Sequence, residues 1–186
     1  NNSRIHDDVA KDPRLPFQRH YNSDAPHLAV SPWRHTYESS VKPEGSLSIV
    51  RRPDGREISF RDDGATWRNQ QGGKESLTRL MGLSGPTGWQ LTTPSDTVEL
   101  YDLFGRLTSI VDRDGHKRIL NYNSNGQLIS GIDDTGRQLV FSYNSQGQLV
   151  RLVDAGGGIH QYAYNASGNL INVIHPDNST IVYHYN

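Results

Sequence analysis

The chain has 186 residues, a net charge of −1, 33% hydrophobic residues and no cysteine. A nearly neutral chain without a basic stretch is a poor match to nucleic-acid binding, and a chain without cysteine has neither disulfides nor a catalytic thiol. No run of about 18 apolar residues is present, so we expect no membrane-spanning helix within these residues.

The first half of the chain, residues 1–92, is predicted to be one β-rich module and contains all three tryptophans. SLSIV at 46–50 and RRPDGREISF at 51–60 predict strands, with a tight turn at Pro-Asp-Gly inside the second stretch. The stretch KESLTRLMGLSG at 74–85 is compatible with either a short helical turn or a strand. The sequence leaves these two alternatives open.

The second half, residues 93–186, is predicted to be a separate domain because a seven-residue pattern recurs there every 21 residues. The pattern reads Tyr, polar, two variable residues, Gly, polar, Leu, as in YNSNGQL at 122–128 and YNSQGQL at 143–149. Self-similarity at a fixed step of this size indicates a repeat architecture. Four copies are complete and a fifth starts at Tyr185, so we expect the chain to be an excerpt of a longer protein.

The Tyr, Gly and Leu of each complete copy are predicted to be structural positions. They are Tyr101, Gly105, Leu107, Tyr122, Gly126, Leu128, Tyr143, Gly147, Leu149, Tyr164, Gly168 and Leu170. The glycines stand where a short hairpin loop requires positive φ.

Runs such as RQLVFSY at 137–143 predict the strands between these loops, and they alternate with period two. The positions two before each Tyr are large and apolar or aromatic, so they predict one aromatic face: Leu120, Phe141, Tyr162 and Tyr183. The repeat tyrosines predict a ladder along the sheet: Tyr122, Tyr143, Tyr164 and Tyr185. The sequence therefore predicts an all-β fold of antiparallel hairpin repeats that form a curved sheet.

Three of the histidines are candidate metal ligands: His160, His175 and His184. No HExxH motif or comparably spaced cluster is present, so the sequence favours hydrogen-bonded strand and turn histidines. No catalytic, cofactor-binding or metal-binding residue is assigned from the sequence, and no cofactor is expected.

Aspartates also keep the step of 21 residues, at Asp112, Asp133 and Asp154. They could form a calcium ladder, but the nonapeptide typical of calcium-binding β-rolls is missing, so turn formation is the favoured interpretation. The adjacent carboxylates Asp62 and Asp63 could suggest the acid and base of a glycosidase, since such enzymes use a pair of carboxyl groups. They precede a glycine, which again favours a turn.

The stretch YDLFGRLTSIVDRDG at 101–115 and its three successors resemble the YD repeats of Rhs proteins, a family of bacterial polymorphic toxins. Four further stretches resemble the module that precedes the repeats in these proteins: LPFQRHYNS at 15–23, SPWRHTYE at 31–38, RPDGREISF at 52–60 and GWQLTTPSDTVELYDLFGRL at 88–107. Together the matches cover nearly the whole chain.

The resemblance implies a function that composition and spacing do not. In Rhs proteins the YD repeats wind into a β-shell that holds a C-terminal toxin domain, and a secretion system, often type VI, delivers the assembly. It implies a non-enzymatic structural segment that is cytoplasmic before export and then secreted or delivered to a target cell.

The implied partners are the remainder of its own chain, including an enclosed toxin domain outside these residues, and the spike proteins of the secretion system. Free edge strands predict self-association. The alternative left open is a β-repeat module that binds carbohydrate or a cell surface, in which the tyrosines would stack on sugar rings.

Overall fold

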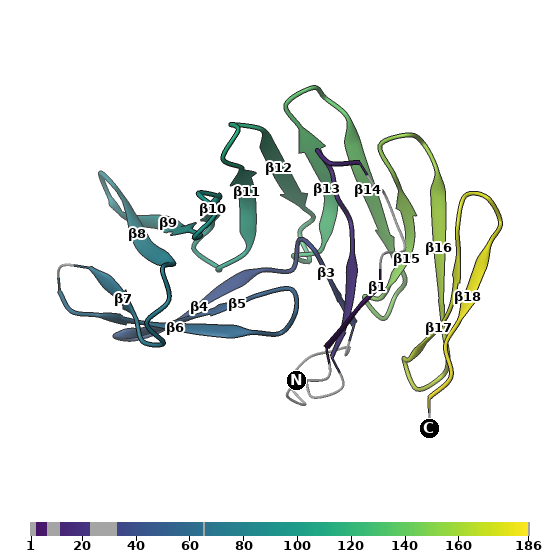
Figure 1. Cartoon of the computed structure of the whole chain (residues 1–186), viewed down its shortest axis with the longest axis horizontal. Helices are drawn as coiled ribbons and strands as arrows, with labels where there is room; N and C mark the ends of the chain where they lie inside the picture. The colour runs from purple at the N-terminus through teal and green to yellow at the C-terminus, as the bar shows by residue number, and fades with distance from the viewer. Residues whose placement is uncertain (1–2, 7–11, 23–32, 65, 186) are drawn as a thin grey trace. The chain divides into compact units, whose positions relative to one another are not determined.

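The computed structural model describes residues 3–6, 12–22, 33–64 and 66–185, and all regular secondary structure in them is β-strand (Figure 1). The predicted all-β class is therefore confirmed. None of these residues belongs to a helix that is long and apolar enough to cross a membrane. Ser23, Ser31 and Pro32 of the family-like stretches and Asn186 of the fifth repeat copy lie outside the described residues.

The chain divides into two compact units. Unit 1 comprises Asn1–His35 and Leu120–Asn186, and unit 2 comprises Thr36–Ile119. The predicted division into residues 1–92 and 93–186 stays a prediction.

Unit 2 is an antiparallel meander in which each strand pairs with the strands before and after it in the chain. Its strands are β4 (Ser40–Glu44), β5 (Leu47–Arg51), β6 (Glu57–Asp62), β7 (Trp67–Asn69), β8 (Ser76–Gly82), β9 (Gly85–Thr92), β10 (Val98–Tyr101), β11 (Leu107–Val111) and the first half of β12 (Lys117–Tyr122).

Two expectations for the first half can be compared with unit 2. The predicted hairpin at 51–60 is present as β5 and β6, with Gly55 at φ 85° in the turn between them. The ambiguous stretch 74–85 is a strand, β8, which pairs with β9. The strand alternative is therefore the correct one, and the helical turn is wrong.

Unit 1 contains a small sheet from the N-terminal part of the chain and the meander of the later repeats. The small sheet is formed by β1 (Ser3–His6), β2 (Arg19–Asn22) and β3 (Trp33–His35). The meander continues from the end of β12 through β13 (Leu128–Asp133), β14 (Gln138–Tyr143), β15 (Leu149–Val153), β16 (Ile159–Tyr164), β17 (Leu170–Ile174) and β18 (Thr180–Val182), drawn in green to yellow in Figure 1.

The predicted aromatic face forms much of the core of unit 1, and Phe141 and Tyr162 on it are 3% and 5% exposed. The N-terminal part of the unit packs on this face. The ring centroid of Phe17 lies 5.7 Å from that of Phe141, and the Arg19 guanidinium lies 5.0 Å from the Tyr162 ring centroid. A guanidinium over an aromatic ring is a favourable cation–π contact. This contact offsets part of the cost of burying the charge of Arg19.

Candidate functional site

The copies of the pattern that begin at Tyr101, Tyr143 and Tyr164 are hairpins in which the Tyr and the Leu are direct cross-strand partners. Tyr143 pairs with Leu149, and the register shifts by one residue just before Tyr143. The same pairing joins Tyr164 to Leu170, with the same shift. The six-residue spacing of Tyr and Leu is therefore the length of a loop with one bulge, and it places two large side chains opposite each other.

The polar residue after each Tyr closes the loop. The Asn144 Oδ1 accepts the backbone N–H groups of Gln146 and Gln148 at 3.1 and 2.9 Å. Gly147 donates its own N–H to the Asn144 carbonyl at 3.0 Å and has φ 79°. The loops that begin at three other residues are closed in the same way: Asp102, Asn123 and Asn165.

The predicted positive φ of the pattern glycines is confirmed, with φ between 75° and 81° at Gly105, Gly126, Gly147 and Gly168. An L-residue with a side chain rarely adopts this conformation, which explains why glycine recurs. That the twelve Tyr, Gly and Leu positions are needed for folding stays a prediction.

The aspartates with the 21-residue step form the second type of loop. The Asp154 Oδ1 accepts the N–H groups of Gly156 and Gly158 at 2.9 and 2.8 Å. Asp112 and Asp133 accept the corresponding backbone N–H groups of their own loops. Turn formation, the favoured interpretation from the sequence, is thus confirmed. Across the part of the chain that is described, no group of three or more His, Asp or Glu side chains could hold a metal ion.

Asp133 is held ionised by its loop. Burial by itself would raise the pKa of Asp133, but hydrogen bonds from Thr135 and Arg137 outweigh it and keep this pKa well below its ordinary value. The Arg137 guanidinium lies 2.7 Å from the Asp133 carboxylate, whose side chain is 1% exposed. The carboxylate therefore stabilises the folded chain only in its charged form.

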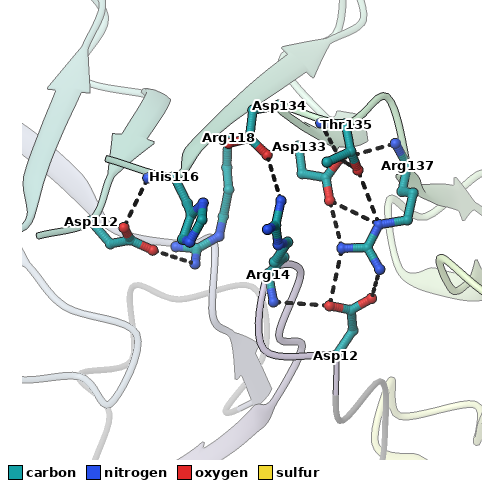
Figure 2. A network of polar contacts seen from close by, with 9 residues as sticks. All are labelled: Asp12, Arg14, Asp112, His116, Arg118, Asp133, Asp134, Thr135 and Arg137. Carbon is teal, nitrogen blue, oxygen red and sulfur yellow. Dashed lines mark hydrogen bonds and ion pairs between the residues drawn. The ribbon is translucent and has the colours of Figure 1, made fainter. Parts of the chain in front are cut away.

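The same arginine also holds the N-terminal segment of unit 1 (Figure 2). Arg137 pairs with Asp12 at 2.5 Å, and Arg14 pairs with the neighbouring Asp134 at 3.3 Å. These partners are more than 100 residues apart in the sequence. No repeat spacing or local motif connects them, so sequence reasoning missed this cluster.

The repeat tyrosines bond each hairpin to the preceding copy. The Tyr143 hydroxyl donates to the Leu128 carbonyl at 3.0 Å, and the Tyr164 hydroxyl donates to the Leu149 carbonyl at 2.8 Å. Tyr185 makes the same bond further along, at 2.6 Å. All three rings are half-buried. The tyrosine ladder is therefore a series of identical links between successive repeats of unit 1.

The first copy of the pattern, in unit 2, uses its tyrosine differently. Tyr101 is 2% exposed, and its hydroxyl donates to the Glu99 carboxylate and lies 2.8 Å from the Ser39 hydroxyl. Burial, together with the charge of Glu99, raises the pKa of Tyr101 well above its ordinary value. The phenol therefore stays protonated and serves as a hydrogen-bond donor.

The carboxylate of Glu99 also accepts two hydrogen bonds from Arg52, at 2.6 and 2.9 Å. Burial alone would lower the pKa of Arg52, but the hydrogen bond and charge of Glu99 outweigh it and raise this pKa. A bidentate pair of this kind fixes both the charge and the orientation of its partners. The pair joins the turn after β5 to strand β10 of the same unit.

The glycine of the first copy is in contact with the backbone of β4. Val41 donates its N–H to the Gly105 carbonyl at 2.9 Å, and Ser40 and Arg106 form an isolated β-bridge. A Cβ atom on Gly105 would lie 1.7 Å from the Val41 carbonyl oxygen. Glycine is therefore required at 105 for close approach as well as for φ.

The remaining candidates from the sequence are one carboxylate pair and three histidines. Asp62 accepts the N–H of Gly64 at 2.9 Å, and Asp63 accepts the N–H of Thr66 at 2.7 Å, so this carboxylate pair forms a turn. His160 and His175 lie together in unit 1, with their Nδ1 atoms 3.3 Å apart, and His184 is exposed.

An open meander of hairpins with a fixed 21-residue step and repeating loop chemistry defines a β-hairpin repeat protein. Residues 122–159 match the family model described as RHS Repeat. The chain therefore carries an RHS repeat at these residues, and the resemblance to the Rhs repeats noted from the sequence is confirmed there. A comparison with curated proteins gave no match.

Solved structures similar to the chain include a TcdB2–TccC3 crystal structure, with 17% identity over 75% of this chain and 10% of the other, at a TM-score of 0.41. Another is a Tc holotoxin pore of Photorhabdus luminescens, with 16% identity over 79% of this chain and 10% of the other, at a TM-score of 0.38. The chain thus spans about a tenth of the length of these structures.

Proposed function

We propose that the chain is a non-enzymatic wall segment of an Rhs-type shell, which encloses a toxin domain lying outside these residues. The observation that carries this proposal is the RHS repeat at 122–159, built from hairpins that follow one another along a single meander. In such an architecture each repeat contacts mainly its neighbours, so a wall grows by addition of identical units.

The use of the aromatic side chains supports a wall over a carbohydrate-binding module. A glycan site needs exposed aromatic faces and free polar groups, whereas the hydroxyls of Tyr143 and Tyr164 bond to backbone carbonyls inside the sheet. The aromatic face that includes Phe141 is covered by Phe17 from the N-terminal segment. These contacts stabilise the sheet and occupy the tyrosine hydroxyls and the Phe141 ring.

The proposal extends to the setting of the chain. A shell of this family would be made in a bacterial cytoplasm and delivered to a target cell, with type VI secretion as the proposed route. Its partners would be the rest of its own chain, including the toxin domain, and the spike proteins of the secretion system. Strand β18, which pairs among the described strands with β17, would be continued by further repeats or associate with another copy.

Expression of the 186 residues inside a bacterium tests whether the segment has an activity of its own. A wall segment is expected to leave growth unchanged, with or without any immunity protein. Growth arrest that disappears when one histidine or carboxylate is replaced, with protein levels unchanged, would contradict the proposal, because it would reveal a catalytic site among these residues.

A further inference from the structure

Two residues of unit 1 depart from the repeat and lie side by side. Counted in steps of 21 residues, His160 stands where the preceding repeat has Leu139, and His175 stands where it has Asp154. The residue at the second position closes its loop by accepting two backbone N–H groups in the earlier repeats. In the last loop the backbone bonds remain, but Asn178 takes the place of glycine at φ 63°. This loop therefore lacks both the aspartate and the glycine of the earlier loops.

The register of β16 and β17 brings the two histidines opposite each other. Gln161 pairs with Ile174, so the next pair outward is His160 and His175. Opposed residues on antiparallel strands have Cβ atoms about 4.5–5.5 Å apart, which lets two imidazoles reach one point. The two Nδ1 atoms are 3.3 Å apart, and the rings lie edge to face with their centroids 5.5 Å apart.

The preceding loop orients one of the two rings. Asp154 uses its Oδ1 to close its own loop, and its Oδ2 lies 3.2 Å from the Nε2 of His160. A carboxylate at this distance favours the tautomer with the proton on Nε2, so Nδ1 accepts the hydrogen bond from the Nδ1 of His175. His160 is 4% exposed, so its ring is also held by packing. A carboxylate behind a histidine is the usual outer partner of a metal-bound imidazole.

We propose that the Nδ1 atoms of His160 and His175 bind a divalent transition-metal ion of the zinc type, with Asp154 as the outer carboxylate that orients His160. Zn–N bonds of about 2.0–2.1 Å in a tetrahedral site place two nitrogens about 3.3–3.4 Å apart, which matches the observed separation of 3.3 Å. The ion takes the place of the hydrogen bond between the two Nδ1 atoms, and water completes the coordination. The ion links strand β16 to the loop after β17 and stabilises this end of the meander.

The repeat itself supplies matched variants for the test. His160→Leu installs the residue of the preceding repeat, and His175→Asn installs the kind of loop acceptor that Asn144 provides. Asp154→Asn keeps the loop acceptor and removes the carboxylate charge. His184→Ala changes an exposed histidine and is the control for adventitious binding. All four variants are expected to fold, which circular dichroism checks.

The experiment is calorimetric titration of Zn²⁺ into the purified chain, with thermal unfolding measured with and without the ion. The wild type and His184→Ala are expected to bind one Zn²⁺ and to melt at a higher temperature in its presence. His160→Leu and His175→Asn should lose both effects, and Asp154→Asn should bind about 10-fold to 100-fold more weakly. Equal binding by wild type and His160→Leu, or absence of binding by a folded wild type at millimolar Zn²⁺, would overturn the proposal.

Discussion

The loops at Gly105 in unit 2 and at Gly147 in unit 1 have the same sequence pattern, the same backbone hydrogen bonds and nearly the same φ, 75° and 79°. They differ in what surrounds the glycine. A Cβ atom on Gly147 would have Gln127 Nε2 as its nearest neighbour at 3.7 Å, whereas on Gly105 it would lie 1.7 Å from the Val41 carbonyl oxygen. One pattern thus serves as a local turn in the later repeat and as a docking point for β4 in the first.

The tyrosines show the same contrast. In the later repeats the Tyr hydroxyl bonds to a backbone carbonyl of the preceding copy, a contact that any number of repeats could extend. In the first repeat Tyr101 instead joins a buried network with Glu99, Arg52 and Ser39. The first repeat therefore combines the general hairpin with contacts specific to the module around it. A repeat can thus be adapted to its surroundings when its Tyr and Gly stay the same and their contact partners change.

The largest effect is expected at the docking glycine. Gly105→Ala adds both left-handed backbone strain and a clash with the backbone of β4, and we expect a loss of about 4 kcal/mol in the free energy of unfolding. The matched change Gly147→Ala adds the strain alone and should lose about 1 kcal/mol. Urea unfolding followed by tryptophan fluorescence and circular dichroism measures both. Equal losses would show that the contact with Val41 has no energetic role.

The buried ion pair is expected to rank next. Glu99→Gln leaves the Arg52 charge without its counter-charge, and the side chains of Arg52 and Glu99 are only 18% and 6% exposed. Removing one partner of a buried pair typically lowers the free energy of unfolding by about 3 kcal/mol. The matched control is Glu57→Gln, which affects a more exposed pair with Arg51 and should change stability by less than about 1 kcal/mol. A small effect for both variants would refute the special role of the network.

Removal of the tyrosine hydroxyl should also cost more stability in unit 2 than in unit 1. Tyr101→Phe removes a hydrogen bond to a buried carboxylate and should lower the free energy of unfolding by about 2 kcal/mol, while Tyr143→Phe removes one to a carbonyl, worth about 1 kcal/mol. Both changes keep the ring, so chemical denaturation compares the hydroxyls alone. A larger loss for Tyr143→Phe than for Tyr101→Phe would reverse the comparison.

Acid should weaken unit 1 through Asp133. Its pKa is lowered in the folded chain, so from about pH 5 downward the unfolded state binds the proton more readily and the stabilisation is lost as pH falls toward the folded pKa. Asp133→Asn should remove this part of the pH dependence, whereas Asp134→Asn should leave it in place. Thermal unfolding of the three proteins between pH 7 and about pH 3 measures the difference. Parallel curves for wild type and Asp133→Asn would contradict the role of this carboxylate.

Sequence periodicity predicted the hairpins because both loop types depend on residues within five positions of each other, such as Asn144 and Gly147. It could not predict the contact of Arg137 with Asp12 or of Gly105 with Val41, because these depend on how distant segments pack. The sequence also did not predict that His160 and His175 lie side by side. Their separation fits no helical metal motif, and only the strand register shows that they are opposed.

The proposed wall around a toxin domain can be tested by protection of that domain, the cargo, from a protease. The assay uses the full-length protein, in which the proposal expects a toxin domain after these residues. The cargo of the wild type and of Ser145→Ala, a change at an exposed loop position, should resist a protease at concentrations that degrade the cargo when it is expressed alone. Gly105→Ala should make the cargo sensitive, because it disrupts the first repeat. A cargo that is digested as quickly in the wild type as when expressed alone would contradict the proposed enclosure.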